Sequence, residues 1–79
     1  MIGQYIKAAM KQARYEILED GSFYGEIAAL KGVWANADTL EETRGELEEV
    51  LEGWIVLSLS RNLPIPPVGG VSLEITTAP

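Results

Sequence analysis

The stretch GVWANADTLEET, Gly32 to Thr43, joins two kinds of secondary structure. Its first half alternates with the period of two that is typical of a β-strand, and helical periodicity begins at Asp38-Thr39. Either Asp38 with Glu41 or Thr39 with Glu42 can form a capping box, in which the first side chain accepts a free backbone N–H of the helix. Helix initiation therefore explains these acids, and a catalytic corner is the less favoured interpretation.

The strand predicted at residues 33–37 separates its side chains onto two faces. Val33, Ala35 and Ala37 share one face, whereas Trp34 and Asn36 point the other way. We expect Trp34 to lie either under an N-terminal helix or in a subunit contact.

Upstream, the sequence predicts a helix over residues 1–13 and then a β-hairpin. The helix has apolar residues at helical spacing, with Lys7 and Lys11 on another face. Asp20-Gly21 separates two β-prone runs, which is a strong short-range signal for a hairpin. Gly25 stands inside the second run, where another side chain or backbone segment can approach closely.

Downstream, a helix from about Leu40 to about Arg61 is the clearest prediction in the chain. The expected buried stripe consists of Leu40, Thr43, Leu47, Val50, Leu51, Trp54 and Leu57, and the glutamates lie off it. Val56 and Leu59 fall outside the stripe, so the last turns are apolar nearly all round. We expect a second contact there, to the first helix or to a neighbouring subunit; a wider core is the alternative.

Three prolines in NLPIPPVGG predict a semi-rigid crossover, and the alternation in VSLEITT predicts a last strand over residues 71–77. The expected fold is α+β, with an N-terminal helix, a three-stranded antiparallel meander, a long amphipathic helix and a final strand (β-β-β-α-β after the first helix). We expect one domain over residues 1–79, comprising the helix at 1–13 and the core at 14–76.

Composition excludes several classes of function. The 79 residues contain neither cysteine nor histidine, which removes thiol nucleophiles, Ser-His pairs and disulfides. Residues 1–14 carry three bases and no acid, a charge of plus 3, and the remainder carries three bases and twelve acids, a charge of minus 9. This split favours self-association or a basic partner, with solubility alone as an equally weighted alternative, and argues against direct nucleic-acid binding. Without a membrane span or a signal peptide, we expect a cytoplasmic protein.

The acids do not indicate a chemical site. Most of them follow one helix as a solvated face, so we expect no catalytic residue and no metal ligand. Gly69-Gly70 follows prolines and precedes a strand, the reverse of a phosphate-binding loop, and no cofactor is expected.

The chain resembles the HicB-like antitoxin domain, a compact module with a partial ribonuclease H fold. The likeness is carried by YEILEDGSFYGEIAALKGVWANADTLEET at residues 15–43, by the acidic helix GELEEVLEGWIVLSLSRN and by LPIPP. Lys31 and Ala37 depart from the proline and glycine that the family commonly has there. The C-terminal DNA-binding domain of full-length members has no counterpart in this sequence, so we do not expect operator binding.

The resemblance implies a non-enzymatic antitoxin that binds and neutralises a small basic toxin that cleaves mRNA. The alternative is a homo-oligomeric domain with a regulatory or scaffold role and no toxin; a metal-dependent nuclease is the least favoured hypothesis. In either of the first two cases we expect a dimer or tetramer. The predicted partner or oligomer interface consists of Trp34, Glu42, Glu46, Glu49, Trp54, Val56, Leu57 and Leu59.

Overall fold

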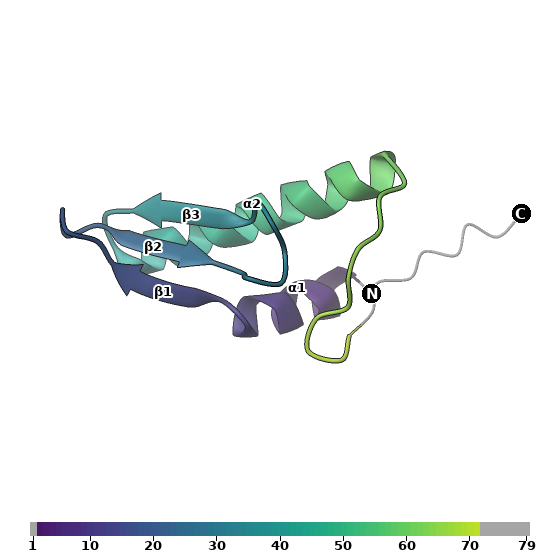
Figure 1. Cartoon of the computed structure of the whole chain (residues 1–79), viewed down its shortest axis with the longest axis horizontal. Coiled ribbons are helices and arrows are strands. Elements are labelled where there is room, and N and C mark those ends of the chain that lie inside the picture. Colours follow the sequence, from purple (N-terminus) through teal and green to yellow (C-terminus); the bar gives the residue numbers. More distant parts are fainter. Residues whose placement is uncertain (1, 72–79) are drawn as a thin grey trace, which may run out of the picture.

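The computed structural model describes residues 2–71. In chain order these residues form α1 (Ile2–Lys11), β1 (Arg14–Ile17), β2 (Phe23–Glu26), β3 (Trp34–Ala37) and α2 (Leu40–Ser60). Figure 1 shows the sheet against the first part of α2, while α1 lies next to α2 beyond the end of the sheet. The predicted α+β order is confirmed through α2. The final strand predicted at 71–77 lies outside the described residues except for Val71, which forms a single bridge with Val68.

The hairpin between β1 and β2 turns at Asp20-Gly21, as predicted. The Asp20 carboxylate accepts hydrogen bonds from the Ser22 N–H at 2.9 Å and from the Ser22 hydroxyl at 2.6 Å, and Gly21 has a φ of +83°. β3 pairs antiparallel with the other edge of β2, so the strand order is β1-β2-β3. The predicted meander is confirmed, with strands of four residues each that are shorter than the runs in the sequence.

The predicted close approach at Gly25 is made by an aromatic ring. Gly25 lies directly opposite Tyr15 in the sheet. A Cβ atom built at Gly25 would lie 2.8 Å from two atoms of the Tyr15 ring and 3.2 Å from Cγ2 of Thr43 on α2. Glycine at this position therefore lets the Tyr15 ring and helix α2 pack directly onto the middle strand.

Helix α2 begins with the second of the two predicted capping pairs. The Thr39 hydroxyl oxygen accepts the Glu42 N–H at 3.1 Å, and the same hydroxyl lies 3.0 Å from the Glu42 carboxylate. The Thr43 side chain is fully buried, and its hydroxyl lies within hydrogen-bond distance of the Thr39 and Phe23 carbonyls. The contact between Thr43 and Phe23 links the first turn of α2 to β2.

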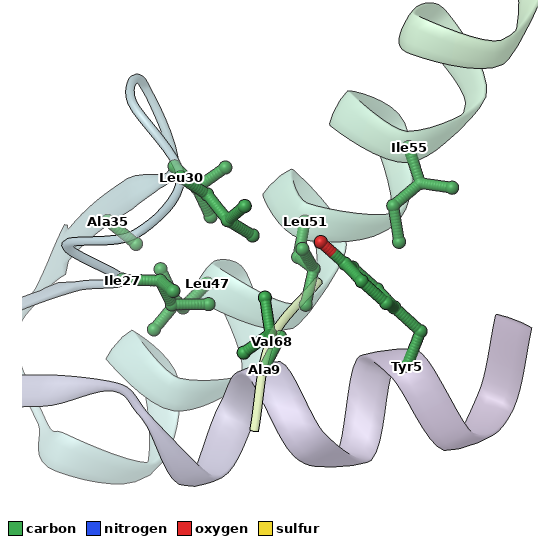
Figure 2. Close-up of a cluster of buried hydrophobic side chains, with 10 residues drawn as sticks. Tyr5, Ala9, Ile27, Leu30, Ala35, Leu47, Leu51, Ile55 and Val68 are labelled. Atoms are coloured by element: carbon green, nitrogen blue, oxygen red, sulfur yellow. The ribbon is translucent and has the colours of Figure 1, made fainter. Parts of the chain in front are cut away.

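The core lies between the two helices, the inner face of the sheet and the segment after α2 (Figure 2). Tyr5 points from α1 towards α2 and donates its hydroxyl hydrogen to the carbonyl of Pro66. The buried apolar residues are Tyr5, Ala9, Ile27, Leu30, Val33, Ala35, Leu47, Leu51, Ile55 and Val68. The predicted crossover after α2 thus returns past α1 and contributes to the core, whereas α1 itself ends at Lys11, before the predicted residue 13.

The predicted buried stripe of α2 is partly wrong. Leu40, Val50 and Leu57 are 47%, 38% and 47% exposed, while Ile55 and Ser58 are buried. From Thr43 the buried positions advance in four-residue steps through Leu47 and Leu51 to Ile55, and each step turns the buried direction by about 40°. The turn follows the packing partners: α2 packs on β2 and β3, and farther along the helix Leu51 and Ile55 share the core with Tyr5 of α1 (Figure 2).

Candidate functional site

Four of the predicted interface residues share the face of α2 that points away from the core. Glu42, Glu46 and Glu49 are exposed, and at about 100° per residue they span only about 60° around the helix axis. Val56 lies on the same face two turns beyond Glu49 and is 65% exposed. This outer face of α2 is therefore acidic in its first half and apolar near its end.

The apolar end of α2 includes more residues than Val56. Val50, Trp54 and Leu57 follow one another at helical spacing along the flank of the outer face, with Trp54 half-buried and Leu57 47% exposed. Leu59 differs, because it is partly buried and packs against the core. At Leu59 the structure therefore agrees with the alternative, a wider core, while Val56 and Leu57 remain in solvent.

Trp34 lies on the opposite side of the molecule. Its neighbour Ala35 faces α2 and is buried, so the alternation of β3 turns the Trp34 ring to the outer face of the sheet, where it is 53% exposed. The ring stacks on Tyr24, with centroids 6.0 Å apart and planes at 27°. The expectation that Trp34 lies under the N-terminal helix is wrong, and the structure separates Trp34 from the predicted interface residues of α2.

The outer face of the sheet brings together charged and aromatic side chains from all three strands. The Tyr24 hydroxyl lies 3.4 Å from the Glu26 carboxylate. Burial raises the pKa of the Tyr24 hydroxyl, and the nearby carboxylates of Glu26 and Glu16 raise this pKa further. By strand register, this outer face consists of Arg14, Glu16, Tyr24, Glu26, Trp34 and Asn36.

A third feature is a cationic groove between the helices. Lys7 and Lys11 stand one turn apart on α1, and Arg44 from the first turns of α2 adds a third positive charge, with Glu48 as the single acid in the lining. The space between them has a volume of about 360 Å³, and a neighbouring groove of about 450 Å³ also uses both lysines. Half of the six basic residues of this acidic chain therefore line one junction.

None of these surfaces, within the described residues, gathers a set of metal ligands. Cysteine and histidine are absent from the sequence, and within residues 2–71 no three acidic side chains converge so that they can hold an ion. Over the same range, neither helix combines the length and the hydrophobicity needed to cross a bilayer. What the described surfaces present instead is exposed carboxylates, aromatic rings and apolar side chains.

Sequence reasoning missed two parts of these surfaces. Glu26 was not identified as a neighbour of Trp34, although the period-two alternation of adjacent strands is a signal that can place the two on one face. Arg44 joins Lys7 and Lys11 only through the packing of α2 against α1, for which the sequence carries no local signal.

Comparison with known proteins supports the family rather than an activity. The family model described as UPF0150-like matches residues 4–66, and this small family is related to HicB-like antitoxins. The crystal structure of TTHA0281 from Thermus thermophilus is similar to this chain, with a TM-score of 0.88 and 41% sequence identity over 94% of this chain and 93% of that one. No protein with a curated description matches the chain in sequence. Because the family model covers well over half of the residues, the chain belongs to the UPF0150-like family.

Proposed function

We propose that this protein is a non-enzymatic antitoxin of the cytoplasm that binds a small basic toxin and blocks its cleavage of mRNA. The relation of the UPF0150-like family to HicB-like antitoxins supports this class of function. The observation that carries the proposal is the acidic half of the outer face of α2, formed by Glu42, Glu46 and Glu49.

The charge of this acidic face affects mainly the rate at which the partner associates. Exposed carboxylates of one sign attract an oppositely charged protein over distances up to about 10 Å at 0.1 M salt, which raises the association rate more than it slows dissociation. The net charge of minus 6 extends this attraction over the whole molecule. The proposal therefore predicts a complex whose formation weakens as salt increases.

The test begins with capture of the partner and ends with its activity. Tagged protein is immobilised, lysate of the native host is passed over it at moderate salt, and retained proteins are identified by mass spectrometry. The expected result is a small basic protein in stoichiometric amount that cleaves RNA when purified alone and stops cleaving when this protein is added. Recovery of further copies of this chain alone would reject the antitoxin function.

A matched pair of variants tests the role of the helix. Glu46→Lys reverses a charge on the outer face of α2, and Glu19→Lys makes the same change beside the hairpin turn, where Glu19 is also exposed. We expect Glu46→Lys to slow association with the captured protein more than Glu19→Lys does. Equal effects would show that only the net charge matters.

A second candidate function is a homo-oligomeric regulatory or scaffold domain without a toxin. It is favoured by the apolar end of α2, where Val56, Leu57 and the flanking Trp54 leave apolar surface in solvent. A chain of this length buries too little surface to be very stable alone, so covering this patch with a second copy adds stability. A dimer or tetramer is compatible with both candidate functions.

A further inference from the structure

The outer face of the sheet is the side that α2 does not cover. Ala35 and Gly25 on the inner face are buried against the helix, whereas the alternating residues of the same strands point the other way. Figure 1 shows α2 on one side of the three strands and α1 beyond their end. Within residues 2–71 the outer face is therefore open for a contact with another molecule.

Two aromatic rings occupy the centre and one edge of this face. Trp34 on β3 stacks on Tyr24 of the middle strand, yet more than half of the Trp34 surface remains in solvent. Large exposed aromatic rings are typical of the anchoring points of protein interfaces, where a partner side chain covers them. The electron-rich face of an indole ring attracts a cation more strongly than the faces of other aromatic side chains do.

Carboxylates surround the aromatic pair. Glu26 lies directly opposite Trp34 in the sheet and 3.4 Å from the Tyr24 hydroxyl, and Glu16 lies directly opposite Tyr24. Glu16, Tyr24 and Glu26, with Tyr15 and Arg14, line a shallow hollow of about 220 Å³. Two carboxylates against one guanidinium leave the hollow with an excess of negative charge, so its charge complements a cationic side chain.

We propose that this face is the docking site for an arginine-bearing segment of a basic partner protein, with the guanidinium over Trp34 and paired with the Glu26 carboxylate. A guanidinium is planar, stacks on aromatic rings and donates hydrogen bonds to a carboxylate, which matches both elements of the face. The proposal rests on the proposed function, since a basic protein is the partner in both. It assigns anchoring to the sheet and leaves long-range attraction to α2.

The test uses a short probe that needs no knowledge of the partner. Protein labelled with ¹⁵N is titrated with capped tri-arginine at moderate salt, and the indole N–H signal of Trp34 is identified by its loss in Trp34→Leu. We expect this signal to shift saturably while the indole signal of Trp54, on α2, stays in place. A capped tri-citrulline peptide, which is neutral and of similar shape, should produce no shift.

Matched variants distinguish the loss of the docking site from the effect of a change in net charge. Glu26→Gln should weaken binding about threefold or more, because it removes a charged partner and a charge next to the stacked rings. Glu19→Gln removes the same charge beside the hairpin turn, where Glu19 is exposed, and should leave the affinity unchanged. Should Trp34→Leu fail to fold, the comparison of Glu26→Gln with Glu19→Gln still tests the docking site.

Three results would overturn the proposal. One is an equal loss of affinity in Glu19→Gln, and another is a shift of the Trp54 signal as large as that of Trp34. The third is a Trp34 signal that moves with protein concentration alone, because a second copy of the chain would then cover the face.

The outcome is distinguishable from failure of the proposed function. Peptide binding at Trp34 without any toxin in the lysate would keep the site and remove the antitoxin function. Capture of a toxin that binds Glu26→Gln as well as it binds the unchanged protein would keep the function and place docking elsewhere.

Discussion

Substitution of Gly25 by alanine tests the tightest contact in the fold. The new Cβ atom would lie 2.8 Å from the Tyr15 ring and 3.2 Å from Cγ2 of Thr43, so either the ring or the helix must move. Overpacking of this kind lowers the free energy of unfolding by about 1–3 kcal/mol. Replacing a strand glycine by alanine raises it by about 0.5–1 kcal/mol, because alanine loses less conformational entropy on folding. We expect a net loss of about 1–2 kcal/mol in the free energy of unfolding.

The assay is urea and thermal unfolding followed by far-UV circular dichroism, at one fixed protein concentration because self-association shifts apparent stability. For a domain of this size, a loss of about 1–2 kcal/mol lowers Tm by roughly 5–15 °C. Gly45→Ala and Gly53→Ala are the matched controls. Both glycines lie at exposed positions of α2, and the added Cβ would meet nothing within 4 Å. These two changes should raise stability by up to about 1 kcal/mol each.

A double-mutant cycle identifies the cause. If the Tyr15 ring is responsible, Gly25→Ala should cost little or nothing in a protein that already carries Tyr15→Ala. Stability of Gly25→Ala equal to that of the unchanged protein, or an undiminished cost in the Tyr15→Ala background, would refute the reasoning.

Three further predictions concern the cap, the apolar end of α2 and the hairpin turn. Thr39→Ala removes the N-cap of α2 and should lower stability by about 1 kcal/mol in urea unfolding, whereas Thr39→Asn should keep most of it. Val56→Glu should lower the mass measured by light scattering without loss of helix signal, and an oligomer that survives it would exclude this surface as the contact. The pKa of the Asp20 carboxyl is held below 3.8 by the Ser22 hydroxyl and N–H, so its contribution to stability is present above pH 3.8 and is lost as the pH falls through the folded-state pKa. An NMR titration should give an Asp20 midpoint below 3.8 that rises in Ser22→Ala, and a midpoint at or above 3.8 would contradict this.

The two candidate surfaces do not compete for space. The inner face of the sheet packs on α2, so the outer face of the sheet and the outer face of α2 point in opposite directions (Figure 1). A second copy bound at Val56 and Leu57 therefore leaves Trp34 and Tyr24 accessible. Self-association through α2 and docking of a basic partner on the sheet can thus occur in one assembly.

Local chemistry in the sequence determined the elements and their order. The Asp20-Gly21 turn, the Thr39 cap and the switch of periodicity after β3 each depend on residues within a few positions of one another, and all three are confirmed. The close approach at Gly25 was also predictable, because a glycine within a strand indicates a neighbour that needs the space.

Only the tertiary structure decided which surfaces remain for function. The buried face of α2 shifts around the helix axis towards Ile55 and away from Val50 and Leu57. The reason is that α2 extends beyond the sheet, and Ile55 packs in the core with Tyr5 of α1. Trp34, predicted in one interface with residues of α2, lies on the other side of the molecule beside Tyr24, because the opposite face of β3, with Ala35, packs on α2. Periodicity in the sequence predicts which residues share one face of a helix or strand. Which segment packs on that face is decided by contacts between segments that are distant in the chain.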